Sequence, residues 1–295
     1  MSLKPFYIVD VFAEEKYQGN QLAVFREAAE ITDSEMQLIA QETHYSETTF
    51  ILSDEKSDDG YDVRIFTPAC EVPFAGHPTL GTAYIIHKEI EGGESERVNL
   101  NLKVGRIPVT VDRADPDTPL LWMKQNAPEF GKELDKAKVA AALNLDVTDI
   151  SENFPVEEVS TGLPFIIAPL NSLEAVKKAR VDLPVFFDLV EHFEAKAILV
   201  FSPETYRDAN DLNVRVFVDY YNIPEDPATG SGNGCLAGYL VKHHYFGDDT
   251  IDIRVEQGYE INRPSLLLLR AENQAGEIMI YVGGRVVPVA RGEFV

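Results

Sequence analysis

The chain has 295 residues, of which 45% are hydrophobic and 25% are charged. This balance supplies a buried core, and the length fits two domains better than one. The 49 acidic residues against 26 basic ones leave a formal net charge of −23, which disfavours nucleic acid and an anionic membrane surface as partners.

Three features of the sequence bear on the cellular location of the protein. No apolar run approaches the roughly 18 residues that a membrane span needs, and the N-terminus enters a strand-like run without a signal-peptide pattern. The two cysteines form no CxxC pair, as is typical of reduced thiols. We therefore expect a cytoplasmic protein.

The first half alternates strands and helices. Residues 6–12 and 21–25 read as strands on either side of a turn, and residues 33–43 as a helix capped by Asp33 or Ser34. Strand-like runs follow over residues 47–53 and 61–68. Residues 77–90 predict a helix with Pro78 in its first turn, and residues 97–113 alternate like paired antiparallel strands.

The order of elements begins again after a linker rich in Pro and Asp, residues 113–119. Strands are expected over residues 156–170, 197–201 and 212–218, helices over 183–194 and 230–245, and a closing β run over 276–293. The predicted domains are residues 1–115 and 120–295. Packing of the last strand on the N-terminal half is an alternative.

Short motifs repeat in the same order in both halves. Arg64-Ile65-Phe66 matches Arg215-Val216-Phe217, and the segment at Gly105 resembles the one at Gly284. Three further residues recur 154 positions later, and a fourth position changes from His to Ser, which favours a duplicated fold. These are Glu71, Pro73, Gly76 and His77, which become Glu225, Pro227, Gly230 and Ser231.

Each repeat contains a glycine turn that runs into an apolar helix, "AGHPTLGTA" and "ATGSGNGCLAG". Such a helix start presents free N–H groups and partial positive charge, and it binds carboxylate or phosphate. One copy alone would favour a plain helix cap at His77, but two copies favour a shared site for a small anionic metabolite. Residues 232–237 also fit the dinucleotide pattern G-x-G-x-x-A, without the surrounding βαβ units that this motif requires.

Two carboxylates are further candidates for the site. Asp226 is either a turn residue that bonds its own backbone, or a partner of His77 that holds an amine or shares a proton. Glu47 stands at the entrance of an apolar strand, where it is either a solvated surface group or a partly desolvated acid/base. No His, Cys and Asp cluster has metal-ligand spacing, so no metal is predicted.

Five stretches together resemble the PhzF-like (phenazine biosynthesis) isomerase family: "FYIVDVF…GNQLAVF", "SETTFIL", "RIFTPACEVPFAGHPTLGTA", "EDPATGSGNGCLAGYL" and "VEQGYEINRPS". The resemblance runs over essentially the whole chain. It implies the α+β fold of diaminopimelate epimerase and proline racemase, with two pseudo-symmetric halves. Each half is expected to be a β-barrel-like sheet around a central helix, with the site between the halves.

The resemblance also implies cofactor-independent acid/base isomerisation, which in the phenazine enzyme acts on dihydro-3-hydroxyanthranilate. The proton-carrying glutamate falls on Glu47, supported by His77 and Asp226. The substrate would be held by Ser231 and by the backbone of Gly76, Gly230 and Gly232.

Epimerases of this fold use two facing cysteines, whereas Ser231 stands at one of those places here. Cys70 and Cys235 are not in equivalent positions, and we interpret both as small buried hydrophobes. An amino-acid epimerase or racemase that uses carboxylate and histidine stays an alternative, as does a non-catalytic metabolite-binding protein. Homodimers are common in the family, so a homodimer is one expected state.

Overall fold

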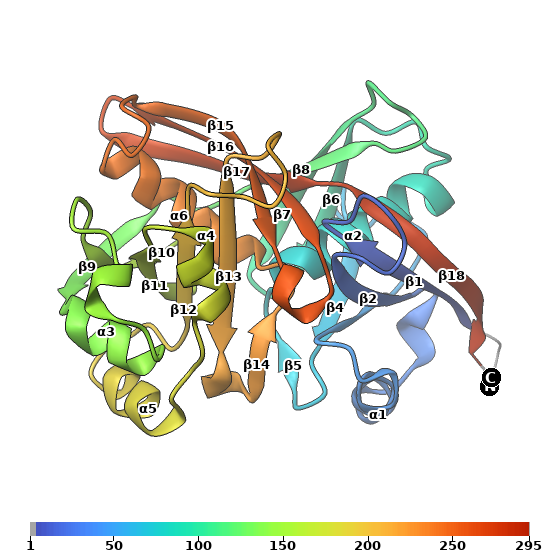
Figure 1. Cartoon of the computed structure of the whole chain (residues 1–295). Coiled ribbons are helices and arrows are strands. Elements are labelled where there is room, and N and C mark those ends of the chain that lie inside the picture. Colours follow the sequence, from blue (N-terminus) through green and yellow to red (C-terminus); the bar gives the residue numbers. More distant parts are fainter. Residues whose placement is uncertain (1–3, 295) are drawn as a thin grey trace. The chain divides into compact units, whose positions relative to one another are not determined.

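The computed structural model describes residues 4–294, and the chain divides into two compact units (Figure 1). Unit 1 contains residues up to 123 together with the C-terminal segment from 283, and unit 2 contains residues 124–282. Residues 1–3 and 295, the outer ends of the two predicted domains, lie outside the described residues. The stretch predicted as a linker, residues 113–119, lies within unit 1.

Unit 1 is a set of strands with one long buried helix. Strand β1 pairs antiparallel with β2 and β18, β2 runs parallel to β3, and β4 pairs with β3, β5 and β6. Strand β7 pairs antiparallel with β6 and β8. The strands are β1 (Lys4–Val11), β2 (Asn20–Phe25), β3 (Thr48–Ile51), β4 (Tyr61–Phe66), β5 (Glu71–Val72), β6 (Arg97–Leu102), β7 (Gly105–Asp112), β8 (Leu120–Lys124) and β18 (Val286–Phe294).

Helix α2 (Gly76–Ile85) is the centre of unit 1, as the resemblance implied. Every residue after its first glycine is buried, and it contacts β1, β2, β3, β6, β7 and β18. A helix that is apolar on all sides is stable only when it is enclosed. At Gly81 an added Cβ would meet the Leu22 side chain at 2.5 Å, so glycine permits the close approach of helix and strand. The helix continues as a π-helical turn, Ile86–Ile90.

Helix α1 (Asp33–Thr43) has the predicted bounds but a different N-cap residue. Thr32, not Asp33 or Ser34, is the N-cap, because its hydroxyl accepts from the Glu35 backbone while the Glu35 carboxylate accepts from the Thr32 backbone. This reciprocal capping box satisfies two donors at once.

Unit 2 also encloses a long helix, α6 (Gly230–Lys242), which contacts β10, β11, β15 and β16. Strand β9 pairs antiparallel with β10 and β10 with β11, and β12 runs parallel to β11. Strand β13 pairs with β12, β14 and β15, and β15 with β16. The strands are β9 (Glu129–Leu134), β10 (Val156–Ser160), β11 (Pro164–Pro169), β12 (Ile198–Ser202), β13 (Leu212–Val218), β14 (Ile223–Asp226), β15 (Thr250–Gln257), β16 (Ser265–Gln274) and β17 (Glu277–Gly284), whose last two residues belong to unit 1.

Three shorter helices form a second core in unit 2 with the outer face of its strands, around Val139, Val176, Phe186 and Val200. They are α3 (Lys136–Ala142), α4 (Leu173–Lys178) and α5 (Leu183–Glu191). Of these, only α5 was predicted from the sequence. Single 3-10 turns complete the two units at η1 (Ala28–Glu30), η3 (Val147–Asp149), η4 (Asp219–Tyr221) and η5 (Tyr259–Ile261).

Each unit has an arginine–glutamate ion pair beside the turn that leads to its central helix. In unit 1, Arg64 of β4 donates to both carboxylate oxygens of Glu71 in β5, at 2.9 and 2.8 Å. In unit 2, Arg215 of β13 donates in the same way to Glu225 of β14, at 3.0 and 2.7 Å. Each guanidinium also lies over the ring of the phenylalanine two residues after it. Residues that repeat in the sequence therefore make the same interaction in each unit.

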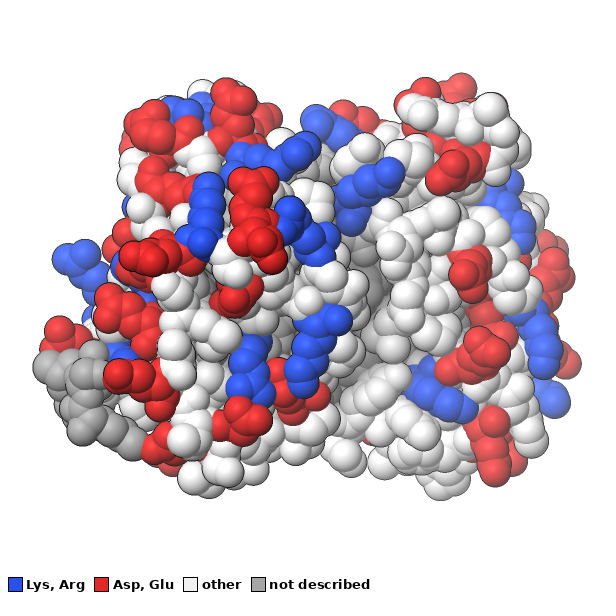
Figure 2. Space-filling model, turned by 180° about the vertical axis from the view of Figure 1, so that it is seen from behind, with Lys and Arg blue, Asp and Glu red and all other residues white. Residues whose placement is uncertain are grey.

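The excess of acidic residues gives the chain a formal net charge of −23. Acidic and basic side chains lie interspersed over the face shown in Figure 2, so neither sign has this face to itself. Within residues 4–294, no helix is both long and apolar enough to cross a membrane.

The pair between Arg215 and Glu225 gives the first prediction. Their side chains are only 4% and 7% exposed, so Glu225→Gln leaves a buried guanidinium without its bidentate partner. We expect a loss of about 3 kcal/mol in the free energy of unfolding, measured by urea titration. The control is Glu94→Gln, because the Glu94 side chain is 81% exposed where it pairs with Arg113. We expect this variant to lose less than about 0.5 kcal/mol. Equal losses in the two variants would contradict the structural role of the buried pair.

Candidate active site

The starts of the two central helices offer backbone N–H groups. Helix α2 follows Ala75 and helix α6 follows Thr229, and within residues 4–294 neither N-cap residue gives its helix a side-chain cap. The first-turn N–H groups and the positive end of the helix dipole therefore stay available to an anion. Gly76, Gly230 and Gly232 lie in these first turns, as does the partly buried Ser231.

Glu47 and His77 come together in unit 1. Glu47 immediately precedes β3, and His77 is the second residue of α2. Oε2 of Glu47 lies 3.4 Å from Nε2 of His77, with the two side chains 18% and 6% exposed. Both of these atoms are buried. The distance brings the two groups to the threshold of a hydrogen bond, which is a common spacing in sites that tighten when substrate binds.

Burial controls the charge of this pair. It lowers the pKa of His77 to about 3, and a hydrogen bond with the backbone of Gln21 offsets only part of that shift. The imidazole is therefore neutral at ordinary pH, so its contact with Glu47 is not an ion pair. A neutral imidazole beside a carboxyl group is able to donate or accept a hydrogen bond without fixing the charge of that carboxyl group.

Asp226 lies in unit 2, at the end of β14 and four residues before α6. Its Oδ2 accepts a hydrogen bond of 2.5 Å from the hydroxyl of Thr229. The side chain of Gln257 in β15 donates to the backbone carbonyl of Asp226 and to the Thr229 hydroxyl. Sequence reasoning assigned no role to Thr229 or Gln257, although both lie in the quoted motifs "EDPATG" and "VEQG".

The structure thus pairs Glu47 with His77, and it places Asp226 beside the first turn that holds Gly230, Ser231 and Gly232. The catalytic and binding roles of these residues, with Gly76, stay predictions. Within the described chain, no group of three His, Cys, Asp or Glu side chains could hold a metal ion.

The prediction that both cysteines are buried is wrong for one of them. Cys235 is buried in α6, and burial raises the pKa of its thiol to about 12, which keeps it protonated and unreactive. Cys70 is exposed, because it lies in the tight turn between β4 and β5, where its backbone N–H bonds to the Thr67 hydroxyl. An exposed turn position leaves a thiol nothing to pack against.

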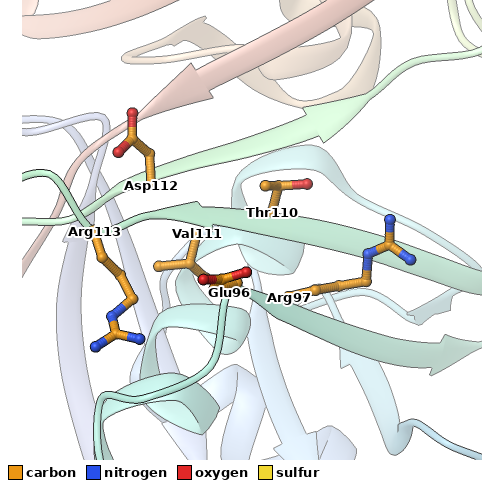
Figure 3. A pocket seen from close by; sticks show the side chains of 6 residues that line it. All are labelled: Glu96, Arg97, Thr110, Val111, Asp112 and Arg113. Atoms are coloured by element: carbon orange, nitrogen blue, oxygen red, sulfur yellow. The ribbon is translucent and has the colours of Figure 1, made fainter.

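A separate pocket opens on the surface of unit 1, along β6 and β7 (Figure 3). Most of its lining side chains are exposed, and acidic and basic groups occur in equal number. It contains none of the predicted site residues. Its lining is Glu96, Arg97, Thr110, Val111, Asp112 and Arg113.

Comparisons with known proteins show the family and the fold of this chain. The family model described as phenazine biosynthesis-like protein matches residues 9–292. The trans-2,3-dihydro-3-hydroxyanthranilate isomerase of Pseudomonas aeruginosa is 33% identical over 97% of this chain and 98% of its own. The structure of the Bacillus anthracis phenazine biosynthesis protein of the PhzF family has a TM-score of 0.90 at 26% identity, and each chain is covered completely.

The fold extends to more distant proteins. A probable proline racemase from Agrobacterium radiobacter has a TM-score of 0.62 over 99% of this chain and 93% of its own, at 10% identity. That likeness concerns the fold alone, and it confirms the predicted diaminopimelate epimerase-like α+β class.

The named relatives define this chain as an isomerase. It belongs to the phenazine biosynthesis-like (PhzF) family, as its motifs implied.

The low pKa of His77 predicts a pH dependence of stability. An unfolded histidine titrates near 6.5, so below that pH the unfolded chain binds a proton that the folded chain excludes until about pH 3. Stability is therefore lost as the pH falls from 6.5. Between pH 8 and pH 5 we expect the wild type to lose about 2 kcal/mol more than His77→Gln in urea unfolding.

The control for this experiment is His192→Gln, since His192 is exposed. This variant should lose as much stability on acidification as the wild type. If His77→Gln is equally acid-sensitive, the buried imidazole is not neutral in the way described.

Proposed function

We propose that this chain is a cofactor-independent isomerase that moves a proton within a small carboxylated metabolite, with Glu47 as the acid/base. The observation that carries the proposal is the contact between Glu47 and the neutral, buried His77. A carboxyl group that must be protonated and deprotonated in alternation needs a partner that does not hold it permanently ionised. A cationic histidine would do so, whereas a neutral one does not.

The substrate carboxylate is assigned to the helix starts. The first-turn N–H groups at Gly76, Gly230 and Gly232, with the Ser231 hydroxyl, supply donors of the kind that stabilise a carboxylate and the negative charge that develops when a carbon loses a proton. The repeated glycine turns and the family membership support this assignment.

Asp226 is assigned to a positive group of the substrate. Its carboxylate accepts from Thr229 at 2.5 Å, and an amino group is the natural partner of such an anion. A substrate with a carboxylate, an amine and a conjugated ring satisfies these groups together. The Pseudomonas aeruginosa relative is named for trans-2,3-dihydro-3-hydroxyanthranilate, so this compound is the first substrate to test. The cytoplasmic location and the homodimer stay predictions.

The proposal predicts the effect of Glu47→Gln. The amide keeps the shape of the side chain but cannot carry the proton, so we expect kcat for isomerisation of trans-2,3-dihydro-3-hydroxyanthranilate to fall by about 10²–10⁴-fold. His77→Gln should cost less, about 10-fold to 10²-fold, because Glu47 keeps its own proton chemistry. Product formation is followed by chromatography at saturating substrate.

The matched control is Glu42→Gln, since Glu42 is an exposed glutamate of α1. It should keep wild-type kcat. An active wild type whose Glu47→Gln variant keeps kcat within about threefold would refute Glu47 as the acid/base. A wild type that binds the compound and leaves it unchanged would instead favour the metabolite-binding alternative.

A further inference from the structure

The stretch "VEQG…RPS" holds the turn in front of α6. The Gln257 side chain is fully buried, and its Nε2 donates to the Asp226 carbonyl at 2.8 Å. Its Oε1 accepts from the backbone N–H of Thr229 at 3.2 Å and from Asn233 Nδ2 at 2.9 Å. Because one end of the amide meets a carbonyl and the other meets a backbone N–H, only one orientation of the amide satisfies both.

The neighbours of Gln257 secure the same turn. Gly258 has φ +77°, and a Cβ added there would meet the Pro227 carbonyl at 2.6 Å. The Ser265 hydroxyl donates to that carbonyl at 2.8 Å. A side chain at position 258 would therefore be strained and would displace the turn. This packing explains why Gly and Ser stand at these two places of the motif.

The orientation of the Gln257 amide determines which group donates in the hydrogen bond between Thr229 and Asp226. Its Nε2 also donates to Thr229 Oγ1, at 3.0 Å. The Thr229 hydroxyl has one proton, and it points to Asp226 Oδ2, at 2.5 Å. That oxygen is therefore an acceptor, and the distance is that of a hydroxyl bound to a carboxylate anion.

We propose that Gln257 and Thr229 are positioning residues that keep Asp226 an anionic acceptor. The inference rests on the proposed function, in which Asp226 meets the substrate. It assigns Asp226 to binding a cationic amine and leaves Glu47 as the carboxyl group that carries the proton. The substrate class is thereby narrowed to amino acids and amine-bearing cyclic acids.

Unit 1 lacks this arrangement. Subtracting the 154-residue offset from Asp226 and Thr229 gives Val72 and Ala75, which have neither a carboxylate nor a hydroxyl. The duplicated glycine turns have therefore diverged: the Glu47–His77 pair accompanies the first, and a fixed anion accompanies the second.

Three other charged residues, Glu225, Glu260 and Arg263, belong to the elements around this turn. Glu225 of β14 is bound by Arg215 of β13. Glu260 of η5 accepts from the Tyr206 hydroxyl and lies 3.9 Å from Arg215. Arg263 follows in the same loop, where its carbonyl accepts from Ser265. These charges are unchanged in the variants below, so a difference between variants reports the Thr229 hydroxyl.

The test compares Thr229→Val with Thr229→Ser. The carboxyl carbons of aspartate are labelled with ¹³C, the Asp226 signal is assigned by its loss in Asp226→Asn, and its titration is followed by NMR. Without the hydroxyl donor the anion is less favoured, so the midpoint in Thr229→Val should rise by about one to two pH units. Thr229→Ser keeps the donor and should titrate like the wild type.

The control is Thr161→Val, which removes a similarly buried hydroxyl that contacts Cys235 Sγ at 3.7 Å. The titration midpoint of Asp226 should not move in this variant.

Gln257→Glu is a second test variant, since its carboxylate would draw the Thr229 proton away from Asp226 and raise the titration midpoint of Asp226. An unchanged or lowered midpoint in folded Thr229→Val would overturn the proposal.

Turnover gives an independent reading. If the enzyme isomerises the test substrate, Thr229→Val should move the acidic limb of its kcat/KM profile to higher pH, and Thr229→Ser should restore it. A merely structural role would lower the whole profile without moving that limb, which would overturn the proposal. If no turnover is found, the proposed function fails, while the NMR titration still decides whether the Asp226 anion is fixed as described.

Discussion

The enclosure of one glycine-started helix in each unit is the constraint on which the rest of the structure depends. Helices α2 and α6 are apolar on all sides, so strands have to surround each of them. A helix that is packed on all sides has little freedom to slide, and its N-terminal turn stays in one place. The polar chemistry of the molecule gathers at these two fixed turns, where backbone donors and positive helix ends are left over.

Comparison of the two units separates what the fold needs from what the chemistry needs. The arginine–glutamate pair beside the turn is present in both units, as expected of an interaction that stabilises the fold. The residues to which we assign proton transfer and charge differ between the units. Glu47 and the neutral His77 accompany the first turn, whereas Asp226, fixed by Thr229, accompanies the second. Under the proposed function, one of the two similar helix starts is assigned to proton transfer and the other to binding a charge.

Much of the scaffold could be predicted from local sequence. The apolar runs predicted α2, α6, α5 and most strands, and the repeats predicted two similar halves. Helices α3 and α4 were missed, because runs of six or seven residues show too little periodicity. The neutrality of His77 could not be predicted, because it depends on strands far away in sequence that cover the ring. The interactions of Gln257 with Asp226 and Thr229 span about thirty residues and leave no local pattern.

The most direct measurement of the central claim is hydrogen exchange during turnover. The enzyme is incubated in D₂O with trans-2,3-dihydro-3-hydroxyanthranilate, and NMR follows deuterium at the ring carbons for the wild type and for Glu47→Gln. The account predicts deuterium at one ring carbon of the product with the wild type and none with the variant. Product that forms in the variant with the same deuterium content would contradict Glu47 as the group that carries the proton.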